Sequence, residues 1–291
     1  MNDICLKIGD KIALVACSNA IPESDRHKID RLCDILRKMG LHPMLSDYIF
    51  AKSGVYAGTP QQRADALNRF FADNAVKMIF DISGGDLANE ILPYLDYDLI
   101  KRSGKLFVGI SDLTSVINAI YHKTGAVCGL YRLKGLYHDE NETQRKIFEN
   151  SLIHGDDSIL KADWRFVQGS RICGTVIGGN LRCLLKLAGT PYMPDFDGKV
   201  LFLESYMTEL SRTAAYLSQL KQMGVFDRIS GLLLGTFTQM QRDNLTPSAE
   251  QLAVTIADNP NLPIAKTENI GHGYDSSCLL IGREYCIEKA D

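Results

Sequence analysis

Residues 105–114, with the sequence Lys-Leu-Phe-Val-Gly-Ile-Ser-Asp-Leu-Thr, hold an apolar run that ends at a small polar residue and passes directly into an amphipathic segment. This pattern predicts a strand over 105–110 and a helix that follows Ser111. Such a turn can aim a hydroxyl into a cleft, with the first amides of the helix pointing toward the same space. Gly109-Ile110-Ser111 lacks the second glycine of the usual nucleophile turn, so Ser111 fits either a catalytic nucleophile or a simple N-cap.

On both sides of this turn, short apolar runs alternate with amphipathic stretches through the first half of the chain. The expected strands are 12–17, 41–45, 76–82, 105–110 and 126–130. Such alternation is typical of a parallel sheet covered by helices. Gly84-Gly85 and Ser111 then follow the carboxyl ends of strands, where open α/β sheets place their sites.

The second half of the chain predicts a smaller domain with more strands. Its expected strands lie near 171–177, 199–204, 229–236, 264–268 and 277–287. We therefore expect an α/β protein in which residues 1–140 form a domain with a parallel sheet and 141–165 form a linker. Residues 166–291 are then a smaller, β-rich C-terminal domain of the α+β type.

Charge and hydropathy exclude several classes of function. The 291 residues include 32 Lys and Arg against 35 Asp and Glu, a formal net charge of −3. This balance leaves no broad basic surface for nucleic acid and no polybasic membrane anchor. No segment has the length of a membrane span, and charges interrupt the N-terminus before any signal-like core. We expect a cytoplasmic protein with small-molecule partners.

The common cofactor and metal motifs are absent. The chain contains neither a Gly-x-Gly-x-x-Gly nor a Gly-x-x-x-x-Gly-Lys-Ser/Thr sequence. Its eight cysteines form no Cys-x-x-Cys pair, so we expect small buried hydrophobic side chains, with a reactive thiol at Cys173 as the alternative. Gly178-Gly179 can hold an anion or simply form a tight turn. We expect no metal and no organic cofactor.

Two polar residues in the second half stand out by position. Glu204 ends the apolar run 200–203, and His272 lies between two glycines. A solvated strand end and an ordinary turn residue would explain them equally well. Together with Ser111, however, they follow the order Ser, Glu, His that many hydrolases use.

The chain resembles the LD-carboxypeptidase family, which includes the microcin C immunity proteins, over nearly its full length. The matching segments, in chain order, are Ile8-Gly9-Asp10-Lys11-Ile12, Tyr56-Ala57-Gly58-Thr59, Gln62-Arg63-Ala64-Asp65-Ala66-Leu67, Gly84-Gly85, Leu92-Pro93-Tyr94-Leu95-Asp96-Tyr97-Asp98, Gly109-Ile110-Ser111-Asp112-Leu113-Thr114, Gly178-Gly179-Asn180-Leu181, Leu201-Phe202-Leu203-Glu204 and Gly271-His272-Gly273. The resemblance implies a Rossmann-like N-terminal domain, a smaller β-rich C-terminal domain and a Ser-His-Glu triad across their interface.

Carried to this sequence, the resemblance implies a nucleophile at Ser111, an orienting carboxylate at Glu204 and a general base at His272. The backbone amides of Gly85 and Asp112 would hold the oxyanion. Weaker substrate contacts are assigned to Gly84, Asp86 and Asn89. The resemblance also implies a homodimer and no cofactor.

One departure from the family affects the expected substrate. Many members carry Arg-Gly-Gly-Tyr-Gly where this chain has Ser83-Gly84-Gly85-Asp86-Leu87, so the arginine is missing. The nearest basic residues that can replace it are Arg132, Lys134 and Arg182. Three hypotheses follow: a peptidase that removes a C-terminal D-amino acid from murein tetrapeptide, a hydrolase of peptidyl- or aminoacyl-nucleotides, and a binding protein without turnover.

Overall fold

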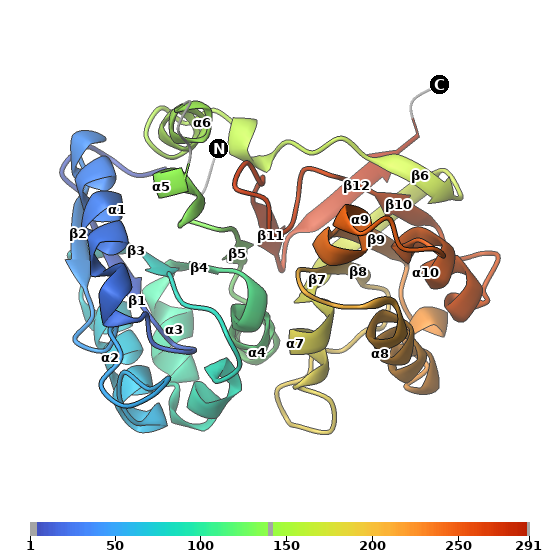
Figure 1. Cartoon of the computed structure of the whole chain (residues 1–291), viewed down its shortest axis with the longest axis horizontal. Coiled ribbons are helices and arrows are strands. Elements are labelled where there is room, and N and C mark those ends of the chain that lie inside the picture. Colours follow the sequence, from blue (N-terminus) through green and yellow to red (C-terminus); the bar gives the residue numbers. More distant parts are fainter. Residues whose placement is uncertain (1–4, 139–141, 290–291) are drawn as a thin grey trace.

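The computed structural model describes residues 5–138 and 142–289, which form two six-stranded sheets with helices packed on them (Figure 1). The first sheet has the order β11-β5-β4-β3-β1-β2. Its strands are β1 (Lys11–Val15), β2 (His42–Leu45), β3 (Val76–Asp81), β4 (Leu106–Gly109), β5 (Cys128–Leu130) and β11 (Leu279–Ile281). β1 to β5 are parallel, and β11 is antiparallel to β5.

Helices cover both faces of this sheet and leave the carboxyl ends of its strands for loops. One face packs against α1 (Arg26–Lys38), α5 (Gly135–His138) and α6 (Thr143–Leu152). The other packs against α2 (Pro60–Ala72), α3 (Tyr97–Ser103) and α4 (Thr114–Thr124). α2 begins with a capping box of Thr59 and Gln62 around Pro60. α4 ends at Gly125 in the left-handed conformation.

The second sheet has the order β12-β7-β8-β9-β10-β6, with four parallel central strands and an antiparallel strand at each edge. The strands are β6 (Arg165–Gln168), β7 (Arg171–Asn180), β8 (Val200–Ser205), β9 (Gly231–Phe237), β10 (Ile264–Lys266) and β12 (Glu284–Glu288). Its helices are α7 (Leu181–Leu185), α8 (Leu210–Gln222), α9 (Thr238–Arg242) and α10 (Ala249–Ala257). The predicted α/β class with two sheets is confirmed.

The prediction of a single strand over 277–287 is wrong. This segment forms two strands, β11 and β12, which belong to different sheets. Gly282, with φ of 90°, turns the chain between β11 and β12. All three residues of β11 are buried, whereas β12 alternates between exposed and half-buried residues. A fully buried strand needs cover on both faces, and β11 has it, because Leu279 and Ile281 pack in one apolar cluster and Leu280 in the other. Strand β6 was not expected, and the division at residues 140 and 166 stays a prediction.

A continuous apolar core joins the two sheets through α4. Val116 and Ile117 of this helix belong to the same cluster as Val176 of β7 and Phe202 of β8. Figure 1 shows α4 between the first sheet and α7, and the two helices are in contact. The two halves are therefore packed together as parts of one interior.

Three of the eight cysteines depart from the expectation of buried thiols. Cys173 of β7 and Cys286 of β12 lie directly opposite each other and form a disulfide. Opposed residues of an antiparallel pair bring their Cβ atoms close enough for this bond. The alternative of a reactive thiol at Cys173 is therefore wrong. Cys5 is exposed, and the other five are buried as expected.

Two further searches cover the described residues alone. Among them, no group of three or more His, Cys, Asp or Glu side chains is arranged to hold a metal ion. Within the same ranges, no helix has the length and apolar character that crossing a membrane requires.

Candidate active site

Ser111 occupies a strained turn at the carboxyl end of β4. Its φ is 63°, in the left-handed region that residues with a Cβ rarely adopt, and such a conformation costs about 1–3 kcal/mol. Gly109 permits the tight turn, because a Cβ there would lie 2.8 Å from the Cβ of Leu113. The N-cap alternative for Ser111 is wrong: Ile110 caps the 3-10 turn Ser111–Leu113, and Leu113 caps α4.

Glu204 and His272 form a buried pair at the carboxyl edge of the second sheet. Glu204 is fully buried in β8, and its Oε2 lies 2.5 Å from Nδ1 of His272, which follows β10 on a loop. Its other oxygen accepts a hydrogen bond of 2.9 Å from Nδ2 of Asn180. A carboxylate with both oxygens engaged is stable when buried, so Glu204 is not a solvated strand end.

The imidazole of His272 is oriented by this contact. In a neutral imidazole whose Nδ1–H donates to Glu204, the other ring nitrogen, Nε2, carries a lone pair. Nε2 is buried and has no hydrogen-bond partner among the residues that the structure describes. The Tyr206 ring stacks on the imidazole, with centroids 4.8 Å apart and an angle of 12° between the planes. The ring is thus held in place by Glu204 and Tyr206.

Ser111 Oγ is not bonded to His272. In the described ranges neither Ser111 Oγ nor His272 Nε2 has a hydrogen-bond partner. The structure therefore brings Glu204 to His272 and leaves the contact from Ser111 to His272 unformed. Such contacts are often long in unliganded enzymes and shorten when substrate binds.

Asn180 connects the helix after Ser111 to the Glu204–His272 pair. Its backbone N–H donates to Thr114 Oγ1 of α4 at 2.9 Å, while its side chain bonds to Glu204. Sequence analysis quoted Asn180 within a motif but gave it no role. The available signal was an amide at the end of an apolar strand, the same position in β7 that Glu204 has in β8.

Arg132 holds the loop that carries His272. Its Nη1 donates to the carbonyl oxygen of His272 at 2.5 Å, and its guanidinium lies 4.5 Å from the ring centre of Tyr274. Arg132 follows β5, so this bond joins the first sheet to the loop of the second. The guanidinium proposed for a substrate carboxylate is thus engaged with the protein backbone.

Gly85 lies in a loop after β3 where no larger residue fits. Its φ is 124°, and a Cβ would lie 2.2 Å from Cγ of Asn19. Asn19 Oδ1 in turn accepts a hydrogen bond of 2.9 Å from the backbone N–H of Asp86. Within the described residues the N–H of Gly85 has no partner, as an oxyanion donor requires.

The Asp112 carboxylate ties three segments together beneath this loop. It is fully buried, and its Oδ2 accepts hydrogen bonds from Ser18 Oγ at 2.6 Å and from the Ala88 N–H at 2.8 Å. Its Oδ1 pairs with the ammonium of Lys186, just after α7. Sequence analysis considered only the Asp112 amide, and it missed Ser18 and Lys186 because neither lies in a recognisable motif.

The three residues assigned to substrate contacts differ in their surroundings. Asp86 is exposed and pairs with Arg182; this hydrogen bond, helped by Lys186, lowers the pKa of Asp86. Gly84 lines a cavity. Asn89 is exposed in the 3-10 helix Ala88–Tyr94, and its side chain has no hydrogen bond within the described ranges.

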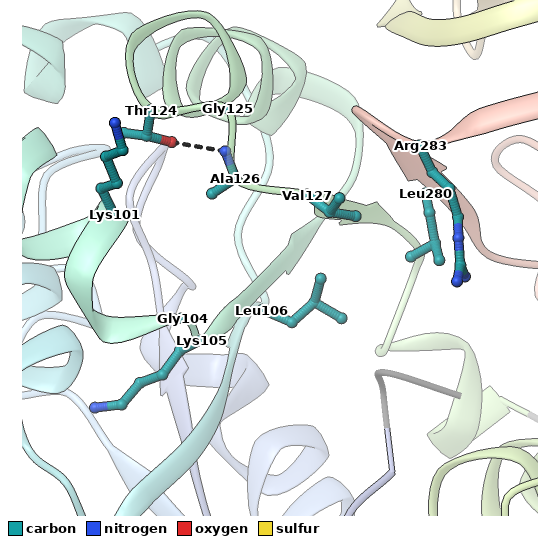
Figure 2. Close-up of a pocket in the computed structure, with 10 residues that line it drawn as sticks. All are labelled: Lys101, Gly104, Lys105, Leu106, Thr124, Gly125, Ala126, Val127, Leu280 and Arg283. Carbon is teal, nitrogen blue, oxygen red and sulfur yellow. Dashed lines mark hydrogen bonds between the residues drawn. The ribbon is translucent and has the colours of Figure 1, made fainter. Parts of the chain in front are cut away.

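Another cavity, of about 310 Å³, lies at the opposite end of the first sheet, near the amino ends of β4 and β5 (Figure 2). Its most buried lysine is committed elsewhere: Lys105 Nζ donates to the carbonyls of Phe70, Phe71 and Asp73 at the end of α2. Figure 2 shows this ammonium pointing away from Arg283. The basic groups do not converge, so we assign no site there.

The molecule is thus a two-sheet α/β protein whose carboxyl edges carry Ser111 on one side and a bonded Glu204–His272 pair on the other. Residues 12–131 match the LD-carboxypeptidase N-terminal domain, and residues 173–287 match the LD-carboxypeptidase C-terminal domain. The chain belongs to the LD-carboxypeptidase family, a family of serine peptidases, and is a hydrolase.

Similar proteins span almost the whole chain. A probable murein peptide carboxypeptidase of Bacillus subtilis is 26% identical and aligns with 98% of this chain and 91% of its own length. The microcin C7 self-immunity protein MccF of Escherichia coli is 24% identical and aligns with 97% and 92%. The solved structure of MccF in complex with glutamyl sulfamoyl guanosine has a TM-score of 0.86 at 21% identity, covering 98% of this chain and 94% of that one.

Proposed function

We propose that this protein is an LD-carboxypeptidase in which Ser111 is the nucleophile, His272 the general base and Glu204 the residue that orients it. One observation carries the proposal: a buried imidazole is bonded through Nδ1 to a buried carboxylate, and its Nε2 is left without a partner. A serine in a strained strand-to-helix turn is the matching half of such a triad.

The proposed reaction forms and breaks an acyl-enzyme. Ser111 Oγ attacks the carbonyl carbon of the last peptide bond while His272 Nε2 takes its proton, and Glu204 stabilises the resulting imidazolium. The N–H groups of Gly85 and Asp112 hold the oxyanion, each typically worth about 2.7–4 kcal/mol in the transition state. The imidazolium then protonates the leaving amine, and water activated by His272 hydrolyses the ester.

For the substrate we propose murein tetrapeptide, from which a C-terminal D-amino acid is removed at an L-centre. Relatives with the names murein tetrapeptide carboxypeptidase and probable murein peptide carboxypeptidase support this choice. The alternative is a peptidyl- or aminoacyl-nucleotide, supported by the likeness to a microcin self-immunity protein. The exposed rings of Tyr206 and Tyr274 near His272 favour it, since nucleobases stack on aromatic faces.

Incubation with both substrate types tests the proposal. Purified protein receives murein tetrapeptide in one reaction and a peptidyl-nucleotide conjugate in another, and mass spectrometry identifies the products. We expect loss of the terminal D-amino acid from the tetrapeptide, and no product from the Ser111→Ala protein. Cleavage of the conjugate alone would favour the alternative, and a protein that binds both but cleaves neither would reject peptidase function.

We further propose that the protein is cytoplasmic and forms a homodimer. The resemblance to the LD-carboxypeptidase family supports these two proposals. Light scattering coupled to gel filtration measures the oligomeric state, and a single-chain mass would reject the dimer. Fractionation of the source cells measures the location.

A further inference from the structure

A second cavity lies beside the Gly84-Gly85 loop, at the carboxyl ends of β1 and β3. Its volume is about 200 Å³, below that of pockets for drug-sized ligands. The wall is formed by residues 19–22, Ser83 and Gly84, by Asp25 with two residues of α1, and by Lys134 and Tyr137 after β5. This size suits one small charged group.

Lys134 is the cation in this cavity that lacks a counter-ion. Lys28 also lines the wall, but its ammonium pairs with Asp25 at 2.7 Å. Lys134 has no hydrogen bond or ion pair among the described residues, and burial lowers its pKa. A partly buried ammonium without a partner is costly, so the cavity favours an anion.

Asp81 and Asp25 attract Lys134 at longer range, but within the described residues neither carboxylate forms an ion pair with its ammonium. Asp81, at the end of β3, accepts hydrogen bonds from the Cys17 N–H and from the N–H and hydroxyl of Ser83. Asp25 is occupied by Lys28. With one paired cation and one unpaired cation, the lining of the cavity carries a net positive charge.

Lys134 is linked to both parts of the candidate active site, through the cavity on one side and through the chain on the other. It shares the cavity with Gly84, which directly precedes the proposed oxyanion donor Gly85. It follows Arg132 by two residues, and Arg132 binds the carbonyl of His272. A group held by Lys134 would therefore share a cavity wall with Gly84, the residue before the proposed oxyanion donor.

We propose that Lys134 binds the C-terminal carboxylate of the substrate in this cavity and thereby selects peptides with a free C-terminus. This inference rests on the proposed peptidase function, because it concerns the residue that leaves. The carboxylate would displace water and pair with the ammonium, while the small volume limits the leaving residue to a short side chain. A peptide whose terminus is an amide would lose this contact.

The test compares murein tetrapeptide with its C-terminal amide for the wild type, Lys134→Met and Lys134→Arg. We expect the wild type to have at least a tenfold higher kcat/KM for the acid. Lys134→Met should lower kcat/KM for the acid about ten- to a hundredfold, mainly through KM, and for the amide less than threefold. Lys134→Arg should keep most of the preference. Lys38→Met, which removes an exposed lysine at the end of α1, is the control.

Equal losses for acid and amide in Lys134→Met would overturn the inference, as would a wild type that does not distinguish the two. Calorimetric binding to Ser111→Ala protein covers the case in which neither peptide is cleaved. Tighter binding of the acid that disappears in Ser111→Ala/Lys134→Met would support the cavity even though the proposed activity had failed. Equal or absent binding of the two peptides would reject the carboxylate site.

Discussion

The two sheets prepare their parts of the candidate active site in different ways. In the second sheet, side-chain hydrogen bonds join Asn180, Glu204 and His272 before any substrate is present. In the first sheet, backbone conformation positions Ser111. Its φ is 63°, and its Oγ has no hydrogen bond within the described residues. One side is thus sensitive to loss of hydrogen-bonding groups, and the other to the conformational preference of a single residue.

The largest loss of activity is expected at Ser111. Two substitutions there distinguish the loss of the nucleophile from the relief of backbone strain. Ser111→Ala and Ser111→Gly should each lower kcat at least a thousandfold, because both remove the nucleophile. Glycine tolerates a positive φ, so Ser111→Gly should be about 1 kcal/mol more stable than Ser111→Ala in urea unfolding. Retention of more than a tenth of wild-type kcat would reject the nucleophile, and equal stability would reject the strain.

On the other sheet, Glu204→Gln should lower kcat about a hundred- to ten-thousandfold. The amide favours the wrong tautomer of His272, which then cannot accept the proton of Ser111. Combined with Ser111→Ala, it should add almost no further loss, because the base has no function without the nucleophile. Glu209→Gln, at an exposed glutamate, is the matched control. If the fold-losses in kcat of the two single variants multiplied in the double variant, the two residues would act independently.

The ion pair of Lys186 and Asp112 links the two sides, and its loss should have an intermediate effect. Lys186→Met leaves a buried carboxylate without its cation, and we expect about 2 kcal/mol less stability and about a tenfold lower kcat. Adding Asp112→Asn removes the unpaired charge and should restore part of the stability. If Lys186→Met alone were within roughly 0.5 kcal/mol of wild type, the range of ordinary surface changes, the link would not be structural.

The smallest effect is expected at the exposed pair of Asp86 and Arg182. Arg182→Met should change stability by less than about 1 kcal/mol at neutral pH. The pKa of Asp86 is lowered from its ordinary value of 3.8, so the contribution is present above that pH and is lost as the pH falls through the lower, folded value. Unfolding curves of wild type and variant should converge in acid. A difference that grows in acid would contradict this sign.

Particular residues show what the sequence can and cannot predict. The turn at Ser111 and the five parallel strands of the first sheet can be predicted from the sequence, because the local pattern of apolar residues marks each of them. Glu204 and His272 stood out as polar residues next to an apolar strand and between glycines, and their contact is confirmed by the structure. Their catalytic roles remain proposals.

Side-chain contacts between segments far apart in the sequence were not predictable. Lys186 is an ordinary helix-flanking lysine until α7 is placed against the turn after β4. The disulfide of Cys173 and Cys286 depends on the register of two edge strands, and residues 171–177 alone do not specify that register. Sequence analysis named Lys134 together with Arg132 and Arg182, and only the cavity distinguishes Lys134 from the other two.

Strand β11 has a consequence for synthesis on the ribosome. It completes the first sheet and covers the edge of β5, yet it is translated after every strand of the second sheet except β12. Until residues 279–281 leave the exit tunnel, β5 presents unpaired N–H and C=O groups that can pair with a nascent neighbour. The nascent chain therefore cannot complete the first sheet before it has made most of the second.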